Sequence, residues 1–216
     1  MTDSHSLVRF VTLEGPDGSG KSTQARLLGE RLAAAGLDVV VTREPGGTRL
    51  GEQVRDIVLG AGRDLDPRAD ALLFSAQRAQ HVSEVIGPAL AAGRIVVCDR
   101  HRDSTIAYQG YGSGLDVEAM TRLQDVATAG LVPDLTILFD LPVDVGLRRR
   151  MTGPAGDRNK FELDRDFDRA YHERVRAGYL RMASEGGRWR MVDAAGDTGA
   201  VADQVAEIVF AAVLPG

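Results

Sequence analysis

A glycine-rich segment near the N-terminus constrains this chain more than any other stretch. Residues 15–23 read Gly-Pro-Asp-Gly-Ser-Gly-Lys-Ser-Thr, which contains the phosphate-binding pattern of a glycine followed, four residues later, by Gly-Lys-Ser. The apolar run from Phe10 to Leu13 predicts a buried strand before it, and a helix is expected to begin near Lys21. Glycines let backbone N–H groups approach a polyphosphate, and a helix start adds its positive dipole end. The segment therefore predicts a nucleotide site.

The loop positions have expected tasks in that site. Lys21 would bring a mobile positive charge to the phosphates, and the Ser22 hydroxyl is the expected ligand of Mg²⁺. The residues predicted to bind ATP are Gly15, Pro16, Asp17, Gly18, Ser19, Gly20, Lys21, Ser22 and Thr23. Asp17 has a second interpretation as a turn-forming residue before a glycine.

Composition narrows the class of protein. The chain has 216 residues, enough for one domain (1–216), and 44% hydrophobic content is ordinary for a globular protein. A net charge of -5 argues against a nucleic acid polymer as partner. The single cysteine, Cys98, lies in an apolar run and is expected in the core. Residues 1–6 lack the apolar stretch of a signal peptide and no run is long enough to cross a bilayer, so we expect a cytoplasmic protein without a membrane partner.

Short apolar strands alternate with helices along the rest of the chain. Further strands are expected at 38–42, 94–98, 135–141 and 189–192, and helices at 50–58, 67–85, 117–129, from about 143, at about 165–184 and at 201–212, with a loop or short helix at 104–114. This alternation predicts an α/β fold, a five-stranded parallel sheet flanked by helices, with right-handed crossovers. Polar clusters at 15–23, 43–47 and 99–101 all follow strands, at the edge where such sheets bind ligands.

Three further motifs carry a specific resemblance. Thr42-Arg43-Glu44-Pro45-Gly46-Gly47, Asp99-Arg100-His101 and the run Ser104-Thr105 to Tyr108-Gln109-Gly110 occur at spacings similar to those of bacterial thymidylate kinases. The similarity extends from Phe10 to the final helix. It implies the three-layer fold of P-loop NTPases of the nucleoside monophosphate kinase type, with a lid at about 148–162. It also implies transfer of the γ-phosphoryl group of ATP to dTMP with Mg²⁺, and a homodimer.

The resemblance assigns residues to the phosphates and the metal. Arg43 and Arg100 would hold the acceptor phosphate, and Asp17 would lie near the sugar 3′-hydroxyl and that phosphate. Asp99 would hold Mg²⁺ together with Ser22, directly or through water. Asp140 also ends a predicted strand, but no Arg-His follows it, so it is the weaker candidate. His101 is expected to be a structural hydrogen-bonding group rather than a base.

The resemblance also assigns the nucleoside pocket. Phe74 would stack on thymine, and Arg78, on the same helix face four residues later, would donate to a base oxygen. Thr105 and Gln109 would approach the base. Tyr108 would stand beside the sugar, where a ribose 2′-hydroxyl would clash with it.

The lid is expected to complete the catalytic residues. The loop has no arginine at its variable positions, as in the bacterial subgroup that takes a catalytic arginine from the lid. Arg150 and Arg158 are the candidates, and Arg148 and Arg149 are alternatively a solvated basic helix end. The predicted catalytic residues are Lys21, Asp17, Arg100, Arg150 and Arg158.

Other functions are compatible with a phosphate-binding loop. Within enzymes, the alternative is a kinase of another nucleoside monophosphate or of a deoxynucleoside. A GTP switch is disfavoured because Asn159-Lys160-Phe161-Glu162 ends in Glu and does not follow a strand. A nucleotide-binding regulatory protein without turnover would leave the acceptor-site arginines without a task.

Overall fold

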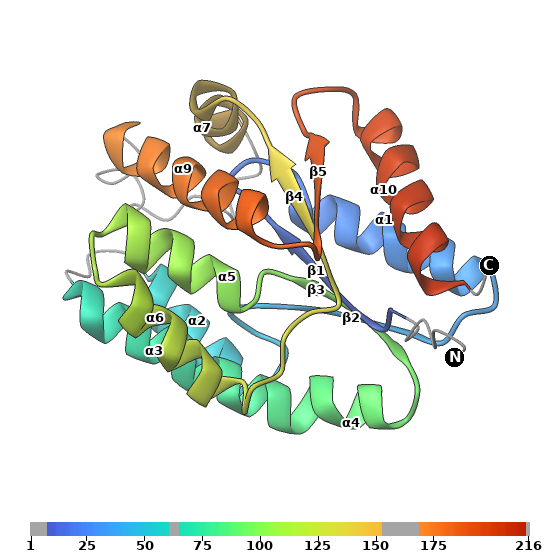
Figure 1. Cartoon of the computed structure of the whole chain (residues 1–216), viewed down its shortest axis with the longest axis horizontal. Coiled ribbons are helices and arrows are strands. Elements are labelled where there is room, and N and C mark those ends of the chain that lie inside the picture. The colour runs from blue at the N-terminus through green and yellow to red at the C-terminus, as the bar shows by residue number, and fades with distance from the viewer. Residues whose placement is uncertain (1–7, 61–64, 153–168, 215–216) are drawn as a thin grey trace.

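Five parallel strands form the centre of the molecule in a computed structural model that describes residues 8–60, 65–152 and 169–214. Their order across the sheet is β2-β3-β1-β4-β5, so the strand that precedes the glycine-rich loop lies in the middle (Figure 1). Leu13 pairs with Asp99 of β3 on one side and with Ile137 of β4 on the other. The strands are β1 (Phe10–Glu14), β2 (Val39–Arg43), β3 (Ile95–Asp99), β4 (Leu135–Asp140) and β5 (Trp189–Asp193). The predicted five-stranded parallel sheet is confirmed.

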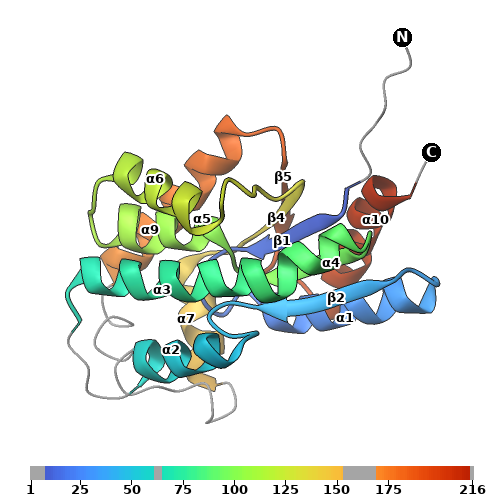
Figure 2. The ribbon, with the colours of Figure 1, turned by 90° about the horizontal axis from the view of Figure 1, so that it is seen from below.

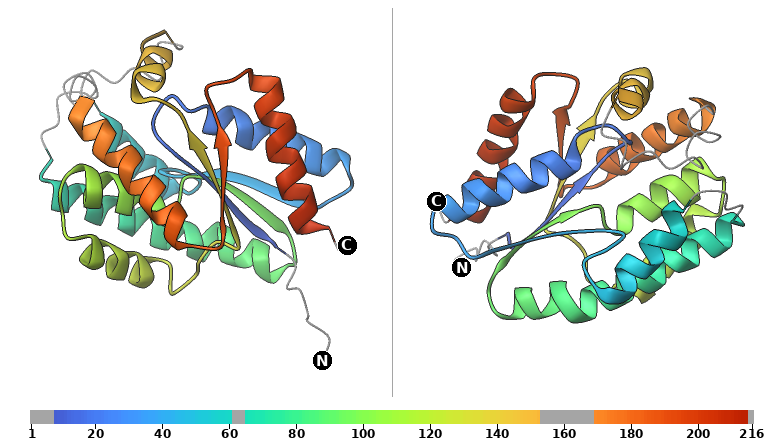
Figure 3. Two further views of the ribbon diagram at one scale, coloured as in Figure 1. Left: turned by 45° about the horizontal axis from the view of Figure 1, so that its top comes forward. Right: turned by 180° about the vertical axis from the view of Figure 1, so that it is seen from behind.

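Helices connect the strands and cover both faces of the sheet (Figures 1 and 3). Helices α1 and α10 cover one face; α3, α4, α5, α6 and α9 lie on the other. The helices are α1 (Lys21–Ala34), α2 (Arg49–Leu59), α3 (Pro67–His81), α4 (Gly87–Ala91), α5 (Arg102–Thr105), α6 (Val117–Ala127), α7 (Val143–Thr152), α9 (Arg169–Glu185) and α10 (Thr198–Val213), with π-helical segments η1 (Val82–Ile86) and η2 (Ile106–Gly112). None of the helices in the described ranges has the length and apolar character needed to cross a bilayer.

Successive side chains of each strand point to opposite faces of the sheet, so the core lies in separate layers on the two faces. On β1, Val11 and Leu13 pack in the cluster that α1 and α10 cover, whereas Phe10 packs with η1 and α4 on the opposite face. A third cluster joins Leu138 to Tyr179 of α9. The same period of two puts Glu14, the last residue of β1, on the face of Phe10. This places a carboxylate inside the layer that α5 and α9 cover.

One helical region differs from the prediction, and a second adopts the helical one of two predicted forms. The helix expected at 67–85 continues through η1 and α4 to Ala91, as one long rod (Figure 2). Pro88 is tolerated because it lies in the first turn of α4, where a π-helical turn has already changed the hydrogen-bond register. The region 104–114 is helical over α5 and η2. The predicted start of the helix near residue 165 lies outside the described residues.

Candidate active site

The glycine-rich loop joins β1 to α1 and needs glycine for two separate reasons. Gly15, Gly18 and Gly20 have φ values of 142°, 74° and 87°, in the left-handed region. A Cβ at Gly15 would lie 2.4 Å from the Phe139 carbonyl oxygen, and one at Gly18 would lie 2.2 Å from that of Gly146. Nothing lies within 4 Å of such an atom at Gly20. The first two glycines thus let the loop pack on β4 and α7, and the third faces open space.

The Lys21 side chain curls back over the loop. Its Nζ donates to the Pro16 carbonyl at 2.7 Å and to Ser19 Oγ at 3.0 Å. Burial, with help from Arg100, lowers the pKa of Lys21 to about 7, although nearby carboxylates oppose the shift. Gly20 offers no side chain to cap α1, whose first turn also carries the exposed Thr23. The loop therefore presents an ammonium group and a helix start to the same region.

Ser22 and Asp99 meet across the carboxyl ends of two strands. The Ser22 hydroxyl donates to Asp99 Oδ2. The other oxygen of the carboxylate, Oδ1, is buried and has no hydrogen-bond partner among the described residues. An unpartnered carboxylate oxygen beside a hydroxyl is a donor set that suits Mg²⁺. By contrast, Arg176 donates to both oxygens of Asp140, at 2.7 and 2.8 Å, so this competing acid is already paired.

Two arginines from distant parts of the chain converge on Asp17. Arg100 Nη2 donates to Asp17 Oδ1, and Arg150 Nη1 donates to Oδ2 at 3.1 Å. Burial alone would raise the pKa of Asp17, but Arg100 and Arg150 outweigh it and hold that pKa well below its usual value. The Asp17 side chain is 24% exposed, so an incoming ligand could reach the cluster. The structure thus brings together three of the predicted catalytic residues.

Arg100 is held by several groups besides Asp17. Its guanidinium lies 4.9 Å from the Tyr108 ring centre and donates to the Tyr108 hydroxyl at 3.1 Å. It also reaches Ser104 Oγ at 3.2 Å and the Gly15 carbonyl at 3.3 Å. The backbone of Arg100 has a φ of 68°, which is uncommon outside glycine and often marks functional positions.

Glu14, which was not predicted, is linked to Arg100 through the hydroxyls of Ser104 and Tyr179. It is fully buried and accepts hydrogen bonds from the His101 N–H at 2.7 Å, Ser104 Oγ at 2.7 Å and the Tyr179 hydroxyl at 2.9 Å. Burial, reinforced by Asp103, raises the pKa of Glu14 to about 7, against these hydrogen bonds and Arg100. The available signal was a charged residue that ends an apolar strand just before the loop.

The predicted base-reading arginine lies in a buried polar network. Arg78 is 1% exposed, and its Nε donates to Glu44 Oε2 at 2.7 Å. Its Nη1 donates to Thr105 Oγ1 at 2.8 Å and to Gln124 Oε1. Its Nη2 makes no hydrogen bond with any described residue, which leaves this nitrogen for a ligand. Thr105 is thus brought together with Arg78, and Glu44 and Gln124 are partners that the motif reading did not identify.

The other predicted acceptor residues are more dispersed. Phe74 is partly buried on α3, one turn before Arg78. Gln109 Nε2 donates to Asp70 Oδ2 at 2.9 Å, so its amide is occupied by a neighbouring acid. Arg43 lies beside Asp99 in the strand register, but its half-exposed side chain pairs with Glu52 at 3.0 and 3.1 Å. The structure does not bring the Arg43 side chain to Asp17.

The expectation for His101 was wrong in one respect. Its ring is fully buried and packs against Phe10 with 5.0 Å between ring centres, but neither ring nitrogen has a hydrogen-bond partner among the described residues. Burial lowers the pKa of His101 to about 3, so the ring is neutral. Its backbone does make structural hydrogen bonds: the N–H donates to Glu14 and the carbonyl accepts from the Ser104 N–H. Cys98 is buried, as predicted.

The consecutive arginines at the C-terminal end of α7 have different surroundings. Arg149 donates to the carbonyls of Ala194 and Ala195 at 2.6 and 2.9 Å and so ties α7 to the segment after β5. Arg148 is exposed to solvent. Arg150, one position further on, is the arginine that reaches Asp17. Arg158 and most of the predicted lid lie outside the described residues.

Comparison with known proteins gives a consistent result. A family model described as thymidylate kinase matches residues 13–205. The thymidylate kinase of Thermomicrobium roseum is 52% identical over 197 residues, 91% of each chain, and that of Solidesulfovibrio magneticus is 51% identical over 209 residues, 93% of this chain and 98% of the relative. The crystal structure of thymidylate kinase from Ehrlichia chaffeensis superposes with a TM-score of 0.74 at 32% identity, covering 93% of this chain and 98% of that one.

Proposed function

The chain belongs to the thymidylate kinase family, and on that premise we propose that it transfers the γ-phosphoryl group of ATP to dTMP, giving ADP and dTDP. The observation that carries this proposal is the meeting of Arg100 and Arg150 at Asp17, within the phosphate-binding loop. A donor phosphate on the loop and an acceptor phosphate beside these arginines would face each other. Transfer between two phosphates depends on neutralised charge and alignment more than on covalent chemistry.

The loop and the start of α1 form the donor side. Gly20 faces open space, so a phosphate can approach its backbone closely. Lys21 is held over the loop by Pro16 and Ser19, and would exchange these neutral partners for phosphate oxygens. Residues 15–23 are therefore the proposed ATP phosphate site.

Ser22 and Asp99 are the residues that would hold Mg²⁺. The unpartnered Oδ1 of Asp99 and the exposed Ser22 residue supply the oxygen atoms that this ion prefers. When bound, Mg²⁺ neutralises phosphate charge and orients the donor.

The guanidinium groups beside Asp17 support an anionic acceptor there. Arg100 and Arg150 both contact the Asp17 carboxylate, so two groups that favour a phosphate as ligand lie at this point of the loop. A guanidinium offers paired donors to phosphate oxygens, which suits this task. The acceptor phosphate is already ionised, so no strong general base is required. Arg43 would join this site only after its side chain leaves Glu52.

The buried polar network supplies a site for the base. Arg78 Nη2 would donate to a thymine carbonyl oxygen, while Thr105 fixes the neighbouring nitrogen. Phe74 would stack on the ring, and Gln109 would contribute from η2. Tyr108, held against Arg100, would border the sugar and disfavour a 2′-hydroxyl.

Arg150 is the proposed catalytic arginine of the lid region. Its contact with Asp17 puts it at the phosphate-binding loop. A planar, permanently charged donor at this point would neutralise charge that develops on the transferred group. Arg158 stays the alternative prediction.

We further propose a homodimer that functions in the cytoplasm. Leu72 of α3 and Val126 of α6 have exposed fractions of 58% and 81%, which is unusual for large apolar side chains and favours a partner surface on these helices. Light scattering of the purified protein tests the mass, and Val126→Asp is expected to reduce it to that of one chain. The cytoplasmic assignment rests on the use of ATP as donor.

Product analysis tests the proposed reaction. The protein is incubated with ATP, Mg²⁺ and dTMP, and the nucleotides are separated by ion-exchange chromatography. Equal amounts of ADP and dTDP are expected, and Arg100→Lys should lower their rate of formation because a point charge replaces paired donors. ADP without dTDP would mean ATP hydrolysis and would contradict the proposal.

A further inference from the structure

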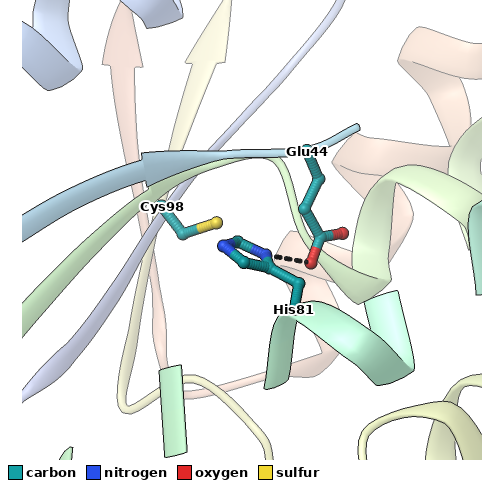
Figure 4. Close-up of side chains that lie close together, drawn as sticks. All are labelled: Glu44, His81 and Cys98. Atoms are coloured by element: carbon teal, nitrogen blue, oxygen red, sulfur yellow. Dashed lines mark hydrogen bonds and ion pairs between the residues drawn. The ribbon is translucent and has the colours of Figure 1, made fainter. Parts of the chain in front are cut away.

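Glu44, His81 and Cys98 form a buried cluster (Figure 4), and Glu44 pairs with Arg78 of the proposed base site. Glu44 follows β2, His81 ends α3 and Cys98 belongs to β3. The potential ligand atoms of the three side chains all lie within 4.8 Å of one another. These residue types at this distance are those of a transition-metal site.

The hydrogen bonds within the cluster argue against a metal ion. Glu44 Oε2 accepts from Arg78 at 2.7 Å, and Glu44 Oε1 lies 2.9 Å from His81 Nδ1. His81 Nε2 lies 2.7 Å from Thr42 Oγ1, and the Cys98 thiol donates to the Arg100 carbonyl at 3.0 Å. Every potential ligand side chain therefore has a protein partner, and the Arg78 guanidinium would repel a cation. Burial also raises the pKa of Cys98 well above its usual value, so the sulfur is a thiol and not a thiolate.

The direction of these hydrogen bonds follows from the charge on Glu44. Burial would raise the pKa of Glu44, but Arg78 and His81 outweigh it and lower that pKa to about 2. An ionised carboxylate only accepts, so His81 Nδ1 carries a proton and donates it to Glu44. Arg78 and His81, three residues apart on one face of α3, thus hold the two oxygens of the same carboxylate.

This arrangement fixes the orientation of the Arg78 guanidinium. Glu44 holds Nε, while Thr105 and Gln124 hold Nη1, so the Nη2 edge is the one presented to a ligand. If Glu44 could turn, the plane of the guanidinium could turn with it. His81 and Thr42 prevent that turn. Gly47 allows the close approach, since a Cβ there would lie 2.7 Å from His81 Nε2.

We propose that His81, acting through Glu44, is a positioning residue that aims Arg78 Nη2 at the acceptor base and thereby sets selectivity for a carbonyl over an amino group on the pyrimidine. This rests on the proposed function, in which Arg78 reads the base of dTMP. A carbonyl oxygen accepts from Nη2, whereas an amino group at the same place only donates. Selectivity would therefore depend on a histidine that does not touch the substrate.

The experiment compares dTMP with 5-methyl-dCMP, which differs from dTMP only by an amino group in place of the 4-carbonyl and by the associated ring tautomer. Steady-state kinetics are measured for wild type, His81→Leu and His81→Asn, because the asparagine amide can still donate to Glu44. Val82→Ala is the matched control, since Val82 packs in the adjacent core and has no bond to this network. Thr42→Val provides a second variant of the network that leaves the α3 residues intact.

His81→Leu is expected to raise the KM for dTMP about tenfold, with kcat changed by less than about threefold, and to lower the preference for dTMP over 5-methyl-dCMP about tenfold. His81→Asn should bring the KM for dTMP and the preference for dTMP most of the way back to the wild-type values. Thr42→Val should raise the KM and lower the preference, each by about threefold. Val82→Ala should leave the preference unchanged. If His81→Leu does not fold, the Thr42→Val and His81→Asn values decide.

Several results would overturn the inference. One is a folded His81→Leu or Thr42→Val enzyme with wild-type KM and preference; another is an equal loss of preference in Val82→Ala. Stoichiometric Zn²⁺ binding that Cys98→Ala abolishes would show a metal site in place of the hydrogen-bonded network. The Arg78→Ala variant distinguishes a failure of the base-reading role of Arg78 from a failure of the positioning role of His81. If it leaves the KM for dTMP unchanged, the base-reading role fails and the inference falls with it; if Arg78→Ala matters but the His81 variants do not, only the inference fails.

Discussion

Replacing Glu14 with glutamine should change how the stability of the protein depends on pH. Glu14 is fully buried, and desolvation raises its pKa to about 7, compared with 4.5 for an ordinary glutamate. In the unfolded chain the carboxyl group releases its proton near the ordinary value. Between these two values the native state holds a proton that the unfolded state has lost, so stability falls as the pH rises through this window. Glutamine has nearly the same shape and does not titrate.

The size of the effect follows from the two pKa values. With about 1.4 kcal/mol for each tenfold change, the difference in unfolding free energy between wild type and Glu14→Gln should fall by about 2.5 kcal/mol from about pH 5 to about pH 8. The Ser104 and Tyr179 hydroxyls can rotate to accept from the new amide, so the three hydrogen bonds need not be lost. At alkaline pH the unfolding free energy of Glu14→Gln therefore rises relative to that of wild type.

Urea unfolding at a series of pH values measures this difference. The fluorescence of Trp189, the single tryptophan, follows unfolding because its side chain is buried between β5 and α9. Glu30→Gln is the control, since Glu30 is exposed and, among the residues that the structure describes, forms an ion pair with Arg26 alone. Parallel stability profiles for wild type and Glu14→Gln would refute the argument. They would mean that the donors around Glu14 outweigh its desolvation and keep it ionised.

Four further variants have defined outcomes. Lys21→Ala should lower kcat by about 10²-fold or more with the fold intact, and near wild-type turnover would contradict its proposed role. Tyr108→Ala should improve use of ribose acceptors relative to deoxyribose acceptors, and an unchanged ratio in the kinase assay would remove the steric argument. Gly18→Ala should destabilise the protein in urea by at least about 2 kcal/mol because its Cβ would lie 2.2 Å from the Gly146 carbonyl oxygen, whereas Gly20→Ala, with open space around it, should cost about 1 kcal/mol from backbone strain alone. Equal losses in these two variants would show that packing on α7 is not the reason for Gly18.

Much of the fold was predictable because its signals are local. The apolar runs that became β1, β3 and β4 are too short for helices, and each is bounded by turn residues. The strand order was not predicted, because it depends on which strands pair across long crossovers. The continuation of α3 through Pro88 was missed for a related reason, since proline is normally a break signal and the π-helical turn that accommodates it has no pattern of its own.

The residues of the candidate site were likewise predictable only in part. The loop residues were predicted because their spacing alone indicates phosphate binding, whereas Asp99 was predicted from the resemblance of its motif; the structure brings Asp99 to Ser22. Glu14, His81 and Tyr179 were not predicted, because a buried acid, a histidine and a tyrosine each have many possible roles. Only the fold shows that Tyr179, distant in sequence, donates to Glu14 and accepts from Arg100. The Arg43 side chain shows the converse, since its motif is specific but it pairs with Glu52.

A competition among acceptors tests the central claim most directly. The protein is given ATP and Mg²⁺ with dTMP, dUMP, dCMP, dGMP and dAMP present together, and the diphosphates formed are quantified at early times. The site described above predicts that dTDP forms fastest, at the same rate as ADP, and that Arg78→Ala reduces this preference. Faster formation of another diphosphate, with little or no dTDP, would contradict the assignment of dTMP as the acceptor.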